Sequence, residues 1–533
     1  MKYYFTFLLL MVSSVIFSQE DAWVYFKDKP NAQTYLDNPL TMLTQRALDR
    51  RTAQNIALNL TDIPLEVTYI NQVKLSSGIT VMAQSKWLNA LHIRGTQNNI
   101  LSLKALSFVD KVVFANKNLN TTSKKVSENQ VFQSKEKLKT TIDYSYGSSA
   151  NQIQMLNGQV LHQQNYTGSG KIIAVLDAGF PGVNTAQPFK KLIDNHQILG
   201  GYDFVNRNDN FYTGDDHGTM VLSTMGGYKE NALVGTAPDA SYYLFITEYD
   251  PTENPVEESY WVEAAEEADR LGVDIITTSL GYFGFDNANY SHTYSDMNGT
   301  TNFISRGAEI AFSKGIVVVA SAGNEGNTAE PHVGAPADAV SVITVGAVTA
   351  SKTKSPFSSI GPSYDLRIKP DVMAQGTAAV ISNTSGNITT VNGTSFSCPI
   401  MAGMIACLWQ AFPSKTNKEI RQMVLQSSDR YANPDNNYGY GIPNFGLTLG
   451  VEDYKTSVSI FSVFPNPAQT IVSFLFENST ASVSIYSVLG QKIIEKQITS
   501  QNPILSVEAL KSGLYFYTFD ADGLHKTGKI IKQ

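Results

Sequence analysis

The chain has little cysteine, little concentrated positive charge and only one long apolar run. Two of its 533 residues are cysteine, too few for a disulfide framework or a four-cysteine zinc site. The formal net charge is −7 and no extended Lys/Arg run occurs, which excludes the basic face that a nucleic-acid partner requires. Hydrophobic residues make up 42% and charged residues 16%, so the composition is typical of folded domains rather than of disorder.

The two cysteines, Cys398 and Cys407, lie in one stretch with a helical pattern. Their spacing in sequence separates them by about 13 Å along a helix axis. A disulfide requires Cα atoms within about 7 Å, so this pair cannot form one without breaking the helix. We therefore expect two small, buried packing residues.

The apolar run lies at the N-terminus. Lys2 precedes residues 5–17, which are apolar apart from one threonine and two serines, and Ser18 offers a small residue for cleavage. This pattern is typical of a secretory signal peptide spanning residues 1–18. A membrane anchor is the alternative, but the run is short and interrupted for a bilayer span.

The length predicts two to four domains. Residues 19–117 have the pattern of a small α+β unit. Its expected strands are 22–26, 78–82 and 108–115, and its expected helices are 40–51 and 85–92. Residues 118–147 are rich in Lys, Ser, Thr, Asn and Gln, a composition that favours an exposed linker open to processing.

Residues 148–450 alternate short apolar runs with helix-length segments. Runs of this length, rich in β-branched residues, predict buried parallel strands in a doubly wound α/β sheet. The five expected strands are Ile172–Leu176, Tyr242–Ile246, Val273–Thr277, Ile316–Ala320 and Val342–Val345. In such sheets ligands bind outside the carboxyl ends of the strands.

Residues 460–533 change in pattern again. Alternation at 482–486, 505–507 and 514–519, with turn residues between, predicts a small all-β sandwich of antiparallel strands. This region contains no cluster of residues suited to chemistry.

Polar residues follow the expected strands or begin the expected helices of the central region. Asp177 and Asn324 follow strands, whereas His217 and Ser395 begin helical runs. A serine hydroxyl needs a neighbouring base, histidine titrates near neutrality, and a buried carboxylate orients the imidazole. Ser395 at a helix start can also offer its backbone N–H to an oxyanion, with the Asn324 amide as a second donor. Pro399 has no N–H for the Ser395 carbonyl, which predicts an open first turn.

Each of these residues alone has an ordinary structural interpretation. A buried Asp or His, a turn Asn and an N-cap Ser are all common, but their joint occurrence in this order favours catalysis. The other histidines stand outside any motif and are expected on the surface or in packing: His92, His162, His196, His292, His332 and His525. The acidic loop 203–216 lacks a recognisable spacing of calcium ligands, so a solvated loop is the better interpretation.

Three segments resemble the active-site segments of subtilisin-like serine proteases, in that family's chain order: Asp177–Gly179, His217–Val221 and Gly393–Pro399. The resemblance extends over residues 146–450. It implies catalysis by Asp177, His217 and Ser395, with Asn324 and the Ser395 N–H as the oxyanion hole. It further implies substrate-binding segments that comprise Ser279, Leu280, Gly281, Ser321, Ala322 and Gly323. Ala178 departs from the family, which usually has Ser or Thr there; we expect a tuned site rather than an inactive one.

The flanking regions resemble known accessory domains. Residues 19–117 are similar to the inhibitory propeptides of secreted subtilases; an unrelated accessory domain is the alternative. Residues 460–533 resemble the sorting domain of type IX secretion in their segments 463–468, 489–491, 510–515 and 529–533; a carbohydrate-binding sandwich is the alternative.

Together these resemblances imply a zymogen of a serine endopeptidase that acts as a monomer on protein or peptide substrates. Its own propeptide would inhibit it, and the type IX secretion machinery would carry it from the periplasm to the outside or surface of a Gram-negative bacterium. No cofactor is required, and a structural calcium ion is left open. The rival functions are a catalytically silent adhesin on the same scaffold and an exopeptidase or dedicated processing protease.

Overall fold

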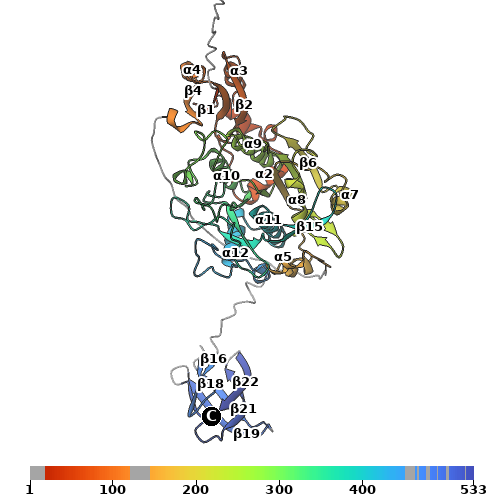
Figure 1. Ribbon diagram of the computed structural model, residues 1–533, viewed down its shortest axis with the longest axis vertical. Helices are drawn as coiled ribbons and strands as arrows, with labels where there is room; N and C mark the ends of the chain where they lie inside the picture. The colour runs from red at the N-terminus through yellow and green to blue at the C-terminus, as the bar shows by residue number, and fades with distance from the viewer. Residues whose placement is uncertain are drawn as a thin grey trace, which may run out of the picture. The chain divides into compact units, whose positions relative to one another are not determined.

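The computed structural model describes residues 19–120, 144–449, 462–464, 467–475, 480–488, 490–499, 503–521 and 524–533. The expected signal peptide and most of the expected linker lie outside these residues. The chain divides into two compact units, residues 1–449 and 450–533 (Figure 1). The first unit contains an N-terminal domain, residues 19–120, and a central domain, residues 144–449.

The central domain is built on a seven-stranded sheet in the order β13-β12-β11-β10-β5-β9-β6, and every neighbouring pair is parallel. The strands are β5 (Ile172–Asp177), β6 (Ile198–Asp203), β9 (Ser241–Ile246), β10 (Ile275–Thr278), β11 (Val317–Ser321), β12 (Ile343–Val348) and β13 (Val372–Gln375). The prediction of a doubly wound parallel sheet is confirmed. All five expected strands are present, and β6 and β13 extend the sheet at its two edges.

Helices cover both faces of this sheet, as the apolar character of its strands requires. Alternate residues of a strand point to opposite faces. Val175 belongs to the core shared with α8 (His217–Gly226) and α11 (Thr394–Ala411), whereas Ala174 belongs to the core shared with α9 (Val256–Leu271) and α10 (Phe303–Ser313). Both cysteines lie in α11, buried and unbridged, which confirms the expectation from their spacing.

The N-terminal domain is a four-stranded antiparallel sheet in the order β2-β3-β1-β4. Its elements are β1 (Gln19–Phe26), α1 (Ala32–Asp37), α2 (Gln45–Ala53), α3 (Val67–Lys74), β2 (Ile79–Ser85), β3 (Ala90–Thr96), α4 (Gln97–Ser102) and β4 (Val109–Phe114). Ala22 and Val24 face the domain's own core, while Trp23 and Tyr25 join the core around α9 and α10. The Trp23 ring stacks on Phe303 with centroids 5.2 Å apart. The sheet therefore packs directly on the central domain (Figure 1).

One expected helix of the N-terminal domain, 85–92, is wrong. These residues form the end of β2, a turn, and the start of β3, with Asn89 in the left-handed region at φ 51°. Ala90 and Leu91 are both fully buried because this sheet is covered on both faces, so the period-two alternation that marks a strand is absent. The expected helix 40–51 begins later, at Gln45, where the Thr44 hydroxyl caps it by accepting from the Ala47 N–H.

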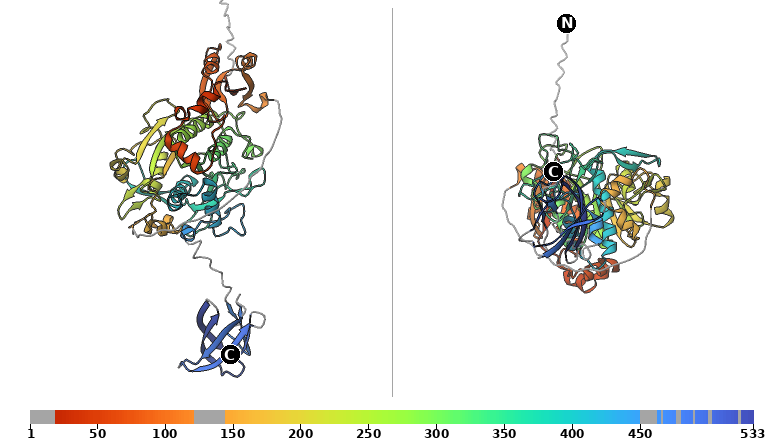
Figure 2. Two further views of the ribbon diagram at one scale, coloured as in Figure 1. Left: turned by 180° about the vertical axis from the view of Figure 1, so that it is seen from behind. Right: turned by 90° about the horizontal axis from the view of Figure 1, so that it is seen from below.

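The second unit consists of two antiparallel sheets, as predicted (Figure 2). One sheet has the order β16-β17-β20 and the other β19-β18-β21-β22. The strands are β16 (Ser462–Phe464), β17 (Ile471–Leu475), β18 (Thr480–Tyr486), β19 (Lys492–Thr499), β20 (Ile504–Ser506), β21 (Gly513–Ala521) and β22 (Leu524–Lys532). Their inward side chains form a separate apolar core, which includes Val472, Val483 and Phe519. Within the described part of the chain, none of the helices has the length and apolarity of a membrane span.

Candidate active site

The carboxyl edge of the parallel sheet brings Asp177 and His217 together. Asp177 is the last residue of β5 and is fully buried; His217 is the first residue of α8. The His217 Nδ1–H donates to Asp177 Oδ1 at 2.7 Å, and the imidazole keeps 27% of its surface exposed. Glycine follows His217 because a Cβ at Gly218 would lie 2.4 Å from the Gly179 carbonyl oxygen. Gly218 thus lets α8 start against the end of β5.

Carboxylates around His217 decide its protonation. Burial alone would lower the pKa of this imidazole, but the charge and hydrogen bond of Asp177 outweigh burial and raise the pKa to about 9. Glu248 and Asp215 act in the same direction. The imidazolium is therefore stabilised at this position, which is the charge state that a general base reaches after accepting a proton.

Among the described residues, only one of the two carboxylate oxygens of Asp177 has hydrogen-bond partners. Its Oδ1 accepts the His217 hydrogen bond and the Ala178 N–H at 2.8 Å. Its Oδ2 is buried and has no hydrogen-bond partner among the described residues. Ala178, the residue after Asp177, carries no hydroxyl and contributes only its backbone N–H to the carboxylate.

Ser395 is the second residue of α11, so its backbone N–H lies in the first turn, where helical N–H groups lack intrahelical partners. Pro399 is accommodated inside the helix, and the Ser395 carbonyl accepts instead from the Ser279 hydroxyl at 2.8 Å. The Ser395 hydroxyl donates to the Ser279 carbonyl at 3.4 Å. Among the described residues it makes no hydrogen bond to His217, whose ring centroid lies 5.9 Å from that of Phe396, the residue after Ser395. Catalytic hydrogen bonds are often long or misaligned in ligand-free sites, and the Ser395–His217 pair has this character here.

Asn324 follows β11 and is oriented by Thr394, the residue before Ser395. The backbone N–H and the hydroxyl of Thr394 donate to Asn324 Oδ1 at 3.0 and 3.1 Å. Because the amide oxygen is held in this way, the amide NH2 is left on the other side, available to a ligand. Gly323 precedes Asn324 with φ +101°, and a Cβ there would lie 2.6 Å from Glu325 Oε2. Sequence patterns did not single out Thr394, since its role depends on a contact 70 residues away along the chain.

The expected substrate-binding segments lie at the same edge of the sheet. Residues 279–281 continue from the carboxyl end of β10, with Ser279 and Leu280 buried and Gly281 exposed. Ser321 and Ala322 are also buried, and Gly323 is half-buried. Within these segments, Gly281 and Gly323 are the more exposed residues, and the substrate-binding role of the six residues stays a prediction.

Glu248 is a further carboxylate of this edge that sequence patterns did not indicate. It follows β9 and accepts from the Tyr282 hydroxyl at 3.3 Å. Burial, together with the nearby Glu253 and Glu257, raises the pKa of Glu248. Over the residues that the structure describes, no group of three or more His, Cys, Asp and Glu side chains is arranged to hold a metal ion.

The neighbouring cysteines are poor nucleophiles. Burial raises the pKa of Cys398 to about 12 and also raises that of Cys407 well above its ordinary value. Both thiols therefore stay protonated at neutral pH, and a thiolate is the reactive form of cysteine. Ser395 is the nucleophile candidate that this helix offers.

A second Asp-His-Ser arrangement lies between the N-terminal and central domains. His92 Nε2 is 3.0 Å from Asp21 Oδ1, and His92 Nδ1 is 2.8 Å from the Ser259 hydroxyl oxygen. Trp23 Nε1–H donates to the same hydroxyl at 2.9 Å. All four side chains are buried, so this arrangement joins the two domains and has no access for a substrate.

Comparison with known proteins assigns all three regions. Residues 168–441 match the model of the subtilase family, residues 21–133 that of the peptidase S8 propeptide domain of Bacteroidota, and residues 462–533 that of a secretion system C-terminal sorting domain. Subtilisin NAT of Bacillus subtilis subsp. natto is 32% identical over 295 residues, which cover 55% of this chain and 69% of the relative. Serine protease AprX of Bacillus subtilis (strain 168) is 28% identical over 337 residues, which cover 58% and 71%.

Among solved structures, MycP1 from the ESX-1 type VII secretion system is similar with a TM-score of 0.44 and 22% identity. The similarity covers 59% of this chain and 88% of that one.

Proposed function

The chain belongs to the subtilase family and is a serine endopeptidase, and from this premise we propose that Ser395 is its nucleophile, His217 its general base and Asp177 the residue that orients the base. The observation that carries the proposal is the 2.7 Å hydrogen bond between Asp177 and His217, beside a serine in the first turn of α11. The Cys398 thiol of the same helix is a poor rival nucleophile, because it is buried and its pKa of about 12 keeps it protonated.

The proposed reaction begins when a peptide carbonyl enters beside Ser395. The serine hydroxyl turns from the Ser279 carbonyl to His217 Nε2 and transfers its proton there as its oxygen attacks the carbonyl carbon. Asp177 stabilises the resulting imidazolium through Nδ1–H. The negative charge on the former carbonyl oxygen is held by the Ser395 N–H and the Asn324 amide.

The intermediate then collapses. His217 returns its proton to the leaving amine, the amine departs, and Ser395 carries the acyl group. Water deprotonated by the same imidazole attacks the ester, and the acid product leaves with Ser395 reprotonated. The backbone at Gly281, which is exposed, and at Gly323, which is half-buried, is proposed to align the substrate by main-chain hydrogen bonds.

The accessory domains indicate where and when this activity appears. The chain carries a subtilase propeptide domain and a secretion sorting domain, which mark a secreted or surface protein made as a precursor. Three finer proposals follow. Residues 19–117 are proposed to keep the enzyme inactive until cleavage within 118–146. Export is proposed to pass through the periplasm of a Gram-negative bacterium by type IX secretion, and the mature enzyme is proposed to act as a monomer.

The test is digestion of an unfolded protein such as casein by the mature enzyme, with removal of the N-terminal domain verified. The wild type is expected to digest it, Ser395→Ala to fail, and Ser313→Ala, which alters an exposed serine of α10, to match the wild type. Loss of the N-terminal domain without any digestion by the wild type, or digestion by Ser395→Ala at the wild-type rate, would contradict the proposal.

A further inference from the structure

The N-terminal domain contacts the central domain at two places. Its sheet packs on α9 and α10, and the segment between β1 and α3 carries α2 to the opposite edge of the parallel sheet, where the strands begin. There the Arg46 guanidinium donates to the carbonyls of Gly272, just before β10, and Gly170, just before β5. The Gln54 amide donates at 2.9 Å to the carbonyl of Gly315, just before β11. We call these contacts of α2 the basal contact.

A buried ionic cluster forms the centre of the basal contact. Arg51 donates to both oxygens of Asp269, at 2.9 and 2.7 Å, and to Asp62 at 3.0 Å. Arg50 donates to Asp269 as well, and Lys314 lies 2.9 Å from Asp62. Each of these five side chains is at most 7% exposed. Arg50, Arg51 and Asp62 belong to the N-terminal domain, so every link except Arg51–Asp62 crosses between the domains.

The contact through the sheet is of a different kind. It combines apolar packing, in which Trp23 stacks on Phe303, with hydrogen bonds between the domains. Its polar part includes the Asp21-His92-Ser259 group, together with Glu263 and Glu266 of α9, which accept backbone N–H bonds from Gln84 and from Trp87 at the β2–β3 turn. These hydrogen bonds to the turn and the apolar packing do not depend on the arginines of α2.

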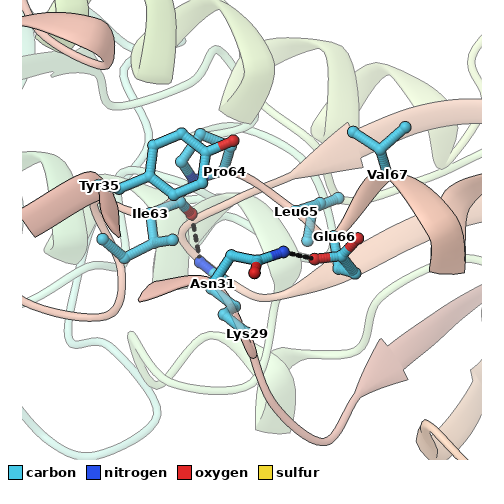
Figure 3. A pocket seen from close by; sticks show the side chains of 8 residues that line it. All are labelled: Lys29, Asn31, Tyr35, Ile63, Pro64, Leu65, Glu66 and Val67. Carbon is cyan, nitrogen blue, oxygen red and sulfur yellow. Dashed lines mark hydrogen bonds between the residues drawn. The ribbon is translucent and has the colours of Figure 1, made fainter. Parts of the chain in front are cut away.

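The two contacts are rigidly connected. Lys29 Nζ donates to the carbonyls of Leu60 and Ile63, in the segment that carries α2, and to that of Lys86, in the β2–β3 turn. Asn31 donates to Glu66 at 2.7 Å in the same region, around a small cavity of about 110 Å³ (Figure 3). Burial lowers the pKa of Lys29 to about 8. The sheet and α2 therefore bind the central domain as one body.

Cleavage of the linker removes the covalent connection between the domains, so only these contacts then hold the N-terminal domain in place. A buried charge whose partner is withdrawn is strongly disfavoured, whereas apolar surfaces tolerate small displacements and entry of water. Asp269 and Lys314 are neutralised across the interface by the N-terminal domain. Partial dissociation at the basal contact therefore has no stable intermediate.

From this arrangement we infer that the face of the central domain beneath its strands is a docking surface for the arginine-bearing helix α2. This surface is formed by Asp269, Asp274, Lys314 and the carbonyls of Gly272 and Val273. Its contact with α2 sets how long the cleaved N-terminal domain stays bound. The inference rests on the proposed function only in that the domain is cut from the enzyme. The sheet-side contact adds to binding, and the arginines of α2 determine how fast the cleaved domain leaves.

The experiment uses the full chain with Ser395→Ala, so that it does not depend on catalysis, and with a recognition sequence for a strict exogenous protease in place of part of residues 121–143. The protein is captured through its N-terminal domain and cut, and the dissociation rate of the central domain is measured. Arg50→Gln with Arg51→Gln is expected to accelerate dissociation at least a hundredfold. The matched control is Lys74→Gln with Lys104→Gln, which removes two exposed cations of the same domain and is expected to stay within twofold of the wild type.

A wild-type dissociation rate for the folded double arginine variant would overturn the inference. Near-ultraviolet circular dichroism before cutting shows whether that variant folds. If it does not fold, the dissociation rate of Arg46→Gln is measured instead. Arg46 suits this test because it lies at the rim, with 36% of its side chain exposed, and forms an ion pair with Asp274 at 2.7 Å. Dissociation three to ten times faster would support the basal contact, and an unchanged rate would overturn it. Failure of the casein test would leave this result standing, since no step of it requires an active enzyme.

Discussion

The Asp177-His217-Ser395 and Asp21-His92-Ser259 groups contain the same three side chains in very different surroundings. The imidazole–carboxylate distances are similar, 2.7 and 3.0 Å. His217 keeps 27% of its side chain exposed, whereas the His92 side chain is fully buried between two domains. The Ser259 hydroxyl is already hydrogen-bonded to His92 and to the Trp23 indole, and Ser395 makes only one long contact, 3.4 Å, to a carbonyl.

This contrast shows that an aspartate, a histidine and a serine in contact do not by themselves make a nucleophile. The group at the sheet edge has what the interface group lacks: access for a substrate and an amide, Asn324, held by Thr394. The interface group has what an active site must avoid, a hydroxyl fully occupied by fixed partners. We propose that the first arrangement serves chemistry in the mature enzyme, whereas the hydrogen bonds of the second join the two domains of the precursor.

The largest expected effect separates the two histidines. His217→Ala removes the base and should lower kcat by about 10⁶, the magnitude measured for the triad histidine of subtilisin. His92→Ala should leave kcat of the mature enzyme unchanged, because His92 departs with the N-terminal domain. Steady-state hydrolysis of a peptide substrate checks both, and a strong loss of mature activity in the His92 variant would show that the two groups are not independent.

The next effect concerns the oxyanion donor that only the sheet-edge group possesses. Asn324→Ala should lower kcat by about 10²–10³ with little change in KM, since the amide acts on charge that develops in the transition state. Asn302→Ala, which alters a buried asparagine at the start of α10, controls for loss of an amide elsewhere. Equal losses in kcat for both variants would remove the special role of Asn324.

The protonation of His217 gives a smaller, graded effect. The pKa of His217 is raised to about 9, so below that pH the base is largely protonated and cannot accept the serine proton. We expect kcat/KM to rise about tenfold per pH unit on the acid side and to level off above about pH 9. A pH–rate profile of the mature enzyme checks this, and a plateau already reached at pH 7 would contradict the assigned environment.

The smallest expected effect concerns Ala178, which stands where the subtilase family usually has serine or threonine. Ala178→Ser introduces a hydroxyl on the residue that follows Asp177, whose Oδ2 has no partner among the described residues. A hydrogen bond to that oxygen should fix the carboxylate and change kcat by no more than about threefold, since a hydrogen bond contributes about 0.5–1.5 kcal/mol in total and only part of it changes along the reaction. Ala186→Ser, at another buried alanine, serves as the control. A change of a hundredfold would mean that Ala178 governs the geometry of the site.

Local patterns predicted the parts of the fold that repeat and missed those set by distant contacts. The strands β5, β9, β10, β11 and β12 are apolar on both faces and were predicted from that feature alone. The edge strand β6 contains the pair Gly200-Gly201 and is only half-buried over most of its length, so it lacked the signal of a buried strand.

The candidate site was predicted as a set of residues but not as a geometry. Chain order and strand ends indicated Asp177, His217, Ser395 and Asn324, because each stands next to a recognisable element. The bonds from Thr394 to Asn324, and those from Arg50 and Arg51 to Asp269, join residues 70 and more than 200 positions apart. Such pairs leave no periodic trace in the sequence, and only the fold reveals them.

The most direct measurement is the position of a fluorophosphonate adduct in the mature enzyme, mapped by mass spectrometry of its peptides. A single adduct at Ser395, absent after His217→Ala, is the predicted result. An adduct on another serine, or the absence of any adduct in enzyme freed of its N-terminal domain, would contradict the assignment of the sheet-edge group as the catalytic one.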